Sequence, residues 1–322
     1  MLQKEIGLQA VGAAMNLAAT IQNEMTGRHT LIKTDRSPVT IADFAVQALV
    51  CQILSSHFPG IPIVGEEDSL AIRRPENREL FAKIIHYLIK CDAPMKEKEI
   101  CDCIDLGGAE PNGTFWTLDP IDGTKGFLRG EQFAIALALL QGGQVRLGIL
   151  GCPNLPRATG GTLFWAIQGQ GGWKIPAAGG SSEPIRASVK TDPTRMKFVE
   201  SYESSHSDKE TQLEISRLLQ ISNPPEQMDS QVKYGIVASG DADIYLRIPN
   251  PATPDYREKI WDHAAGSLIV EEAGGWVSDI DGKKLDFSVG KTLRHNRGIL
   301  ASNGRIHSRV LEIIADLDGG KK

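Results

Sequence analysis

The stretch TLDPIDGTKGF, residues 117–127, decides how the rest of the chain is interpreted. Its two aspartates, Asp119 and Asp122, flank a Pro-Ile step, and a Gly-Thr-Lys-Gly run follows. Asp-Pro and Asp-Gly pairs are common turn signals, because proline fixes φ and aspartate and glycine tolerate tight backbone geometry. The alternative to a plain turn is a metal and phosphate site, and the acids elsewhere in the chain bear on that choice.

Acidic residues stand at the ends of predicted elements in three further places. These are Asp43 in PVTIAD, Glu66 and Glu67 in VGEED, and Asp262 in IWDHAAG. Each has a plain alternative: Asp43 completes a capping box with Thr40, the glutamates form a solvated loop, and Asp262 caps the following helix. Taken together, VGEED and WTLDPID place carboxylates directly after strand-like runs, where open sheets commonly hold ligand groups. Magnesium prefers such oxygen ligands, so the acids predict a shared cation site.

The residues between and after the two aspartates suit that chemistry. The carbonyl of Ile121 can turn toward the same ion, with Pro120 stiffening the approach. Gly123 lets a phosphate come close to the backbone, and the N–H groups at the start of the following helix would face its negative charge. Thr124 offers a hydroxyl beside that phosphate. The stretch therefore predicts a site for phosphoryl transfer.

Composition indicates a globular protein of two lobes. A domain usually has roughly 100 to 200 residues, so a chain of 322 residues is too long for one small core. A content of 41% hydrophobic and 23% charged residues is typical of soluble proteins. A net charge of −5 does not favour a nucleic-acid polymer as partner, because such surfaces are usually basic. We predict mixed α and β lobes at residues 1–165 and 166–322, joined without a flexible tether.

Hydrophobic periodicity predicts helices and strands along the chain. The apolar run 61–68 is predicted to be a strand, and the run 133–153 two paired strands with a tight turn at Gly142-Gly143, repeated more weakly at 161–175. The helical segments are predicted at residues 8–21, 40–58, 76–90, about 208–220 and 309–317.

The first thirty residues and the cysteines suggest where the protein resides. Polar residues interrupt or flank the apolar segment 8–21 and no clear cleavage site follows, so we interpret it as an amphipathic helix, neither signal peptide nor membrane span. The five cysteines include no Cys-x-x-Cys pair. Reduced thiols in the cytoplasm, without contact with a membrane, are the expectation.

Three motifs together resemble a known family. WTLDPIDGTKGF, WDHAAGSLIVEEAGG and VGEE are similar to the signatures of the lithium-sensitive, magnesium-dependent phosphatases of the inositol monophosphatase superfamily. SPVTIADFAVQ, MDSQVKYG and YLRIP resemble its branch of 3'(2'),5'-bisphosphate nucleotidases, and the similarity runs from about residue 33 onward. The resemblance implies a layered α-β-α-β-α sandwich, α+β or α/β in class, with the active site between two lobes.

The resemblance also implies roles for individual residues. The metal ligands would be Glu66, Asp119, Asp122, Asp262 and the carbonyl of Ile121. Asp43 and Thr124 would together orient and deprotonate the attacking water. The substrate would contact Gly123, Thr124, His206, Ser230, Lys233, Arg247 and Asp262.

The last of these contacts have a physical basis of their own. Lys233 and Arg247 can neutralise a second phosphate, although both could also be solvated surface cations, and Ser230 could be an ordinary turn or strand hydroxyl. We interpret His263, beside Asp262, as structural.

The implied activity is hydrolysis of the 3'-phosphate of adenosine 3',5'-bisphosphate to AMP and phosphate, and some members of the branch also act on the sulfated nucleotide. Two or three magnesium ions are expected as cofactors, with manganese as a substitute, in a monomer or homodimer. The alternatives are an inositol polyphosphate 1-phosphatase or inositol monophosphatase on the same metal core, and a non-catalytic protein that senses the nucleotide.

Overall fold

The computed structural model describes residues 2–24, 30–32, 38–155, 160–202, 207–253 and 255–319, with side chains left aside at 30–32 and 38–40. All the helical segments predicted from periodicity are confirmed. The helices are α1 (Leu2–Glu24), α2 (Ile41–His57), α3 (Arg78–Lys90), α4 (Glu97–Asp105), α5 (Thr124–Leu128), α6 (Lys209–Leu218), α7 (Val232–Ala238), α8 (Ala264–Glu272) and α9 (His307–Gly319), with short 3₁₀ turns at Pro75–Asn77 and Pro193–Arg195.

A seven-stranded sheet forms the centre of the molecule. Its strands follow chain order, and every neighbouring pair is antiparallel except the first, which is parallel. The strands are β3 (Ile63–Gly65), β4 (Thr114–Asp122), β5 (Ala134–Gln141), β6 (Gln144–Cys152), β7 (Thr162–Ile167), β8 (Gly172–Pro176) and β9 (Glu183–Ile185). Gly142 and Gly143, both at positive φ, make the predicted tight turn between β5 and β6.

A second sheet of five strands has the order β11-β10-β12-β14-β13, with parallel and antiparallel pairs. Its strands are β10 (Phe198–Glu200), β11 (Glu226–Gln227), β12 (Ile244–Arg247), β13 (Trp276–Ser278) and β14 (Ile299–Ser302). A separate pair of short antiparallel strands, β1 (Thr30–Ile32) and β2 (Pro38–Thr40), precedes α2.

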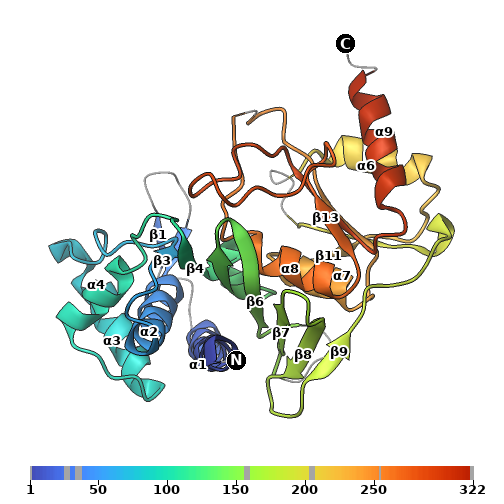
Figure 1. Cartoon of the computed structure of the whole chain (residues 1–322). Coiled ribbons are helices and arrows are strands. Elements are labelled where there is room, and N and C mark those ends of the chain that lie inside the picture. Colours follow the sequence, from blue (N-terminus) through green and yellow to red (C-terminus); the bar gives the residue numbers. More distant parts are fainter. Residues whose placement is uncertain are drawn as a thin grey trace.

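Helices and sheets alternate in five layers (Figure 1). α1 and α2 pack against one face of the seven-stranded sheet, and α8 packs against the other. α7 and α8 also contact the five-stranded sheet, whose outer side is covered by α6 and α9. The predicted α-β-α-β-α sandwich is therefore confirmed.

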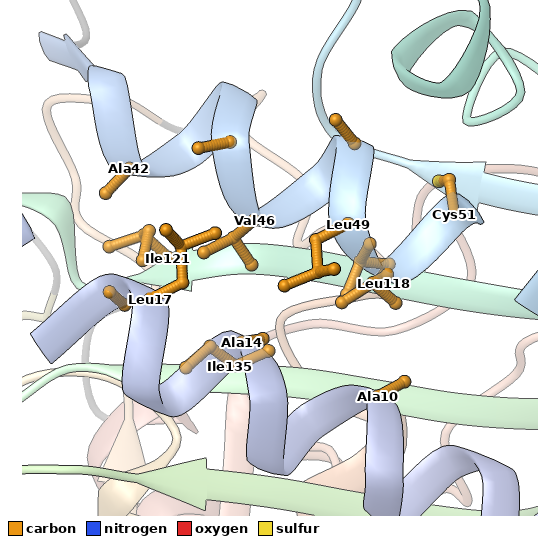
Figure 2. Close-up of a cluster of buried hydrophobic side chains, with 14 of the residues drawn as sticks. Ala10, Ala14, Leu17, Ala42, Val46, Leu49, Cys51, Leu118, Ile121 and Ile135 are labelled. Carbon is orange, nitrogen blue, oxygen red and sulfur yellow. The ribbon is translucent and has the colours of Figure 1, made fainter. Parts of the chain in front are cut away.

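The core between the first helices and the central sheet explains the apolar runs of the sequence. Figure 2 shows Ala10 and Ala14 of α1 and Val46 and Leu49 of α2 in one buried cluster between the two helices, with Leu118 of β4 among the side chains drawn. Small residues on α1 let the two helices approach closely, and their apolar contact area stabilises the pair. This packing holds α2 and β4, the two elements that carry Asp43 and the paired aspartates.

The division into two lobes near residue 165 remains a prediction. The seven-stranded sheet continues through β7, β8 and β9 to Ile185. Elements from both halves of the chain meet around the cavity described below. All five cysteines are free, and four of them are buried.

Candidate active site

A register shift in β4 places both aspartates of the opening stretch at one cavity. In a regular strand, residues three positions apart point to opposite faces of the sheet. The pairing of β4 with β5 is regular up to Asp119 and resumes at Asp122 after an irregularity. As a result both aspartates line the same cavity, while the side chain of Ile121 returns to the core beside α1 and α2. The predicted turn is thus an interruption within a strand.

The cavity has a volume of about 210 Å³ and brings together ten of the predicted site residues. These are Glu66, Asp119, Ile121, Asp122, Gly123, Thr124, Ser230, Lys233, Arg247 and Asp262. Asp43, which the structure describes, is not among the lining residues; it is buried in the first turn of α2. His206 lies outside the described residues, although Ser201, close to it in sequence, lines the cavity.

Among the predicted metal ligands, Asp119 has the most buried carboxylate. Its side chain is buried, and within the described part of the chain its Oδ1 has no hydrogen-bond partner. Burial raises its pKa well above the usual range, and the charges of Glu66, Asp122, Asp262 and Asp43 raise it further. A buried, unsatisfied oxygen among other carboxylates is unfavourable without a cation, so this donor set suits a hard divalent metal ion.

Asp122 is oriented by the segment that leads into α7. The backbone N–H of Gln231 donates to Asp122 Oδ2 at 2.6 Å. The side chain of Gln231 donates to the carbonyl of Trp261 at 2.8 Å and accepts from the N–H of Gly266 at 3.1 Å. Gln231 therefore ties the aspartate of β4 to the chain on both sides of Asp262.

Asp262 lies just before α8, where His263 occupies the N-cap position. Its carboxylate lines the cavity. Burial raises its pKa, and the charges of Asp122, Glu66 and Glu258 raise it further. Asp262 therefore belongs to the same electrostatic cluster as Asp119. The N-cap position of α8 is taken by His263, so Asp262 does not fill the capping position that the alternative assigned to it.

The loop after β3 is held in place by a buried side chain of α2. Gln47 donates to the carbonyls of Glu67 at 2.7 Å and Ile104 at 2.9 Å, and its oxygen accepts from the N–H of Glu67 at 3.0 Å. Glu67 is buried and Glu66 is exposed, yet both line the cavity. The solvated-loop interpretation therefore fails for Glu67.

Gly123 and Thr124 continue the wall formed by β4. Gly123 has φ 88°, and a Cβ there would lie 3.0 Å from Cβ of Ser230. Glycine is thus needed both for the backbone conformation and for the close approach of the segment before α7. Thr124 Oγ1 donates to the carbonyl of Ile121 at 3.2 Å, leaving its lone pairs available to accept.

Two enclosed cations, Lys233 and Arg247, also line the cavity. Lys233 lies in α7 with 3% of its surface exposed, and its ammonium donates to the carbonyl of Met228 at 3.3 Å. Burial lowers its pKa to about 8, whereas Asp122 and Asp229 act in the opposite direction. Arg247 has an 18% exposed side chain. The structure thus excludes the alternative that these two residues are solvated surface cations.

A chain of polar groups supports Arg247. Its Nε lies 2.8 Å from Glu258 Oε1, close enough for an ion pair but without the alignment of a hydrogen bond. Glu258 Oε2 lies 3.1 Å from His263 Nε2, and His263 Nδ1 lies 2.8 Å from the hydroxyl of Tyr234. Burial lowers the pKa of His263, so the neutral imidazole donates from Nε2 and accepts at Nδ1.

Glu258, Asp262 and His263 also bring three potential ligand atoms within 4.8 Å of one another. Because both nitrogens of His263 already have hydrogen-bonding partners, we assign His263 to the support of Arg247. That agrees with its interpretation as a structural residue.

Several residues of the site were not predicted from the sequence. Gln231 and Asp229 lie inside the MDSQVKYG motif, and Glu258 lies two residues before IWDHAAG, so the motifs marked their neighbourhood without indicating their contacts. Tyr245, which also lines the cavity, lies in YLRIP, whereas Tyr256 carries no comparable signal. Each depends on contacts between segments far apart in sequence.

Comparison with known proteins agrees with this fold and site. The model of the inositol monophosphatase family matches residues 1–318, and the chain belongs to that family. A 3'(2'),5'-bisphosphate nucleotidase of Schizosaccharomyces pombe is 41% identical, covering 97% of this chain and 95% of the relative. One from Emericella nidulans is 40% identical, with 97% of each chain covered.

Solved structures share the fold. An inositol monophosphatase of Thermotoga maritima superposes with a TM-score of 0.70 at 21% identity, covering 99% of both chains. CysQ from Bacteroides thetaiotaomicron, described as a bacterial member of the family, gives 0.60 at 21% identity, covering 94% of this chain and 97% of that one. At these identities the likeness concerns the fold alone. None of the helices in the described part of the chain is long and apolar enough to cross a membrane.

Proposed function

We propose that this chain is a 3'(2'),5'-bisphosphate nucleotidase that hydrolyses the 3'-phosphate of adenosine 3',5'-bisphosphate to AMP and phosphate. One observation carries the proposal: a single cavity is lined both by a cluster of carboxylates and by two enclosed cations, Lys233 and Arg247. A substrate with two anionic groups suits this lining, because one group can be bound through metal ions and the other through direct contact with the cations.

Glu66, Asp119, Asp122, Asp262 and the carbonyl of Ile121 are the proposed metal ligands. The unpartnered Oδ1 of Asp119 supports this set, because it needs a cation to offset its burial. When bound, magnesium ions would neutralise the phosphoryl oxygens, lower the pKa of a water molecule and stabilise the leaving ribose oxygen. Two or three ions, or manganese in their place, are consistent with the number of carboxylates.

The chain's own residues position the reactants. Asp43 and Thr124 are proposed to orient the attacking water and remove its proton, with the Thr124 hydroxyl fixed by its hydrogen bond to the Ile121 carbonyl. Gly123 is proposed to let the reacting phosphate approach the backbone. Ser230, Lys233, Arg247 and His206 are proposed to bind the rest of the nucleotide.

The test is phosphate release by the purified protein from adenosine 3',5'-bisphosphate with magnesium, compared with inositol 1,4-bisphosphate and inositol 1-phosphate. We expect the nucleotide to have the highest kcat/KM, with no release in EDTA. Higher kcat/KM for either inositol phosphate would contradict the nucleotide assignment, and binding of the nucleotide without any turnover would favour a sensor. The sulfated nucleotide belongs in the same series as a further substrate.

The cytoplasmic location and the choice between monomer and homodimer remain predictions from the sequence. The five free cysteines support the first, because they are consistent with a reducing compartment.

A further inference from the structure

An ion pair beside the cavity joins two of its walls. Arg129 follows α5, and its Nη2 donates to Oδ2 of Asp229, the residue before Ser230. The carboxylate side chain of Asp229 is 5% exposed and that of Arg129 is 35% exposed. The pair therefore links the chain that follows the metal-ligand strand β4 to the segment that begins α7.

The chain is shaped to bring these two segments together. A Cβ on Gly126 would lie 2.6 Å from Oδ2 of Asp229 and 2.3 Å from the carbonyl oxygen of Gln132. Gly126 thus leaves the space that the Asp229 carboxylate occupies against the backbone of α5. The sequence alone assigned no role to Gly126 of the GTKGF motif. The neighbouring Asp229 carboxylate explains why a glycine stands there.

Arg129 has further partners that limit its movement. Its Nε donates to Oε2 of Glu131 at 2.6 Å, and its guanidinium carbon lies 5.5 Å from the centre of the Tyr202 ring. Tyr202 directly follows Ser201, which lines the cavity. Arg129 is therefore held by three segments at once, and a second carboxylate remains beside it if Asp229 loses its charge.

A second cation lies within electrostatic range of Asp229. The charge of Asp229 acts on Lys233, one turn further along the chain, and the ammonium of Lys233 donates to the carbonyl of Met228 at 3.3 Å. A buried carboxylate that loses its partner is strongly unfavourable, so it takes the nearest available cation. Asp229 and Lys233 line the same cavity, so without Arg129 the ammonium of Lys233 is a cation within range of the Asp229 carboxylate.

We propose that Arg129 is a positioning residue for nucleotide binding: by pairing with Asp229 it keeps that carboxylate away from Lys233, whose ammonium then remains available to the phosphate that is not hydrolysed. The inference rests on the proposed function, in which Lys233 contacts that second phosphate. Arg129 itself does not touch the reacting atoms in this scheme. Its loss would weaken substrate binding and leave the chemical step in place.

The experiment compares Arg129→Gln, Arg129→Lys, Asp229→Asn and the double variant Arg129→Gln/Asp229→Asn in saturating magnesium. For adenosine 3',5'-bisphosphate, Arg129→Gln should raise KM about tenfold and change kcat by less than about threefold. Arg129→Lys should restore a KM near that of the wild type. With adenosine 3'-monophosphate, which lacks the second phosphate, Arg129→Gln should change kcat/KM by less than about threefold.

The double variant separates this role from a structural one. The variants are compared at pH 6, where Lys233 stays protonated even when loss of the Asp229 charge lowers its pKa. Because an uncharged amide at position 229 cannot capture Lys233, the double variant and Asp229→Asn alone should then both have a KM within about threefold of the wild type. A clamp that acted only by joining two segments would make the double variant at least as impaired as Arg129→Gln. That result, or equal losses on both substrates, would overturn the proposal.

Two controls complete the design. Arg217→Gln removes an exposed arginine paired with Glu214 on α6 and should leave KM unchanged. If Arg129→Gln fails to fold, Asp229→Asn still decides the matter, since a structural clamp predicts a raised KM for it and our proposal predicts none. Absence of turnover by the wild type contradicts the proposed function, whereas wild-type turnover without this variant pattern contradicts only the role of Arg129.

Discussion

At the scale of single residues, Asp119 is a carboxylate whose environment favours its neutral form unless a cation is present. Burial and four neighbouring acids raise its pKa, and its Oδ1 has no hydrogen-bond partner within the described part of the chain. An acid whose folded-state pKa is raised destabilises the fold at pH values above its unfolded pKa, and this cost disappears at lower pH. The same residue should therefore contribute to activity with metal and oppose stability without it.

Asp119→Asn should separate these two effects. Phosphate release with magnesium should fall by roughly 10³-fold or more, since a proposed ligand is lost. In EDTA at pH 7, the Tm of the variant should equal or exceed that of the wild type, because the charge repulsion is removed. A variant with normal turnover would remove Asp119 from the metal site, and a lower Tm in EDTA would contradict the electrostatic argument.

Lys233 should make nucleotide binding sensitive to pH near 8. Burial lowers its pKa to about 8 against the opposing charges of Asp122 and Asp229, and Arg247 lowers it further. The ammonium is therefore present below that pH and is lost as the pH rises. KM for adenosine 3',5'-bisphosphate should increase about tenfold between pH 7 and pH 9, following the protonated fraction.

Lys233→Arg is the control for this pH profile, because arginine keeps its charge over the whole range. Its KM should be flat between pH 7 and pH 9. The profile with adenosine 3'-monophosphate should also lack the increase. A wild-type KM that does not change with pH would show that the charge on Lys233 does not contribute to binding.

At the scale of elements, α7 and α8 must pack closely for the site to form. A Cβ on Gly266 of α8 would lie 2.4 Å from the ring of Tyr234 in α7, and Tyr234 is fully buried. Tyr234 in turn holds His263 through its hydroxyl. The contact between these helices therefore sets the position of the groups that support Arg247.

Gly266→Ala should lower the free energy of unfolding by roughly 1–3 kcal/mol, because the added methyl group has no space beside the ring. The matched control is Gly12→Ala in α1, where no heavy atom lies within 4 Å of the added Cβ. This variant should stabilise the protein by up to about 1 kcal/mol through helix propensity. Urea unfolding in EDTA measures both; equal effects would show that the contact with Tyr234 is not the cause.

At the scale of the whole molecule, the carboxylates come from the loop after β3, from β4 and from the segment before α8, so a bound cation links both halves of the chain. A ligand that binds only the folded state stabilises it, by about 2.7 kcal/mol at a concentration one hundred times its Kd. Magnesium should therefore raise the midpoint of urea unfolding of the wild type, and EDTA should reverse the effect. A shift of the same size in Asp119→Asn would mean that the ion binds elsewhere.

Much of this architecture could be predicted from local sequence, and the remainder depends on distant contacts. Periodicity predicted α2 and α3, and the two glycines predicted the β5–β6 turn, because those signals lie within one segment. The register shift that turns Asp119 and Asp122 to one side could not be predicted, since it depends on the pairing with β5.

The same limit applies to the site. Motifs placed most of the cavity residues, whereas the pairing of Arg129 with Asp229 and of Arg247 with Glu258 joins segments that only the fold brings together. Residue types at fixed spacing in the sequence indicate which segments form the active site. The sequence does not show which charged groups pair with one another, because that depends on which residues the fold brings close together.

The distribution of the carboxylates along the chain has a consequence for the order of events in folding. Antiparallel neighbours of the central sheet follow one another in sequence and close short loops, whereas Asp122 and Asp262 meet at the cavity through contacts between segments far apart in the chain. We therefore expect the complete set of proposed metal ligands to form late in folding. A cation that binds so late should act mainly on the rate of unfolding, prolonging the lifetime of the native state without accelerating its formation.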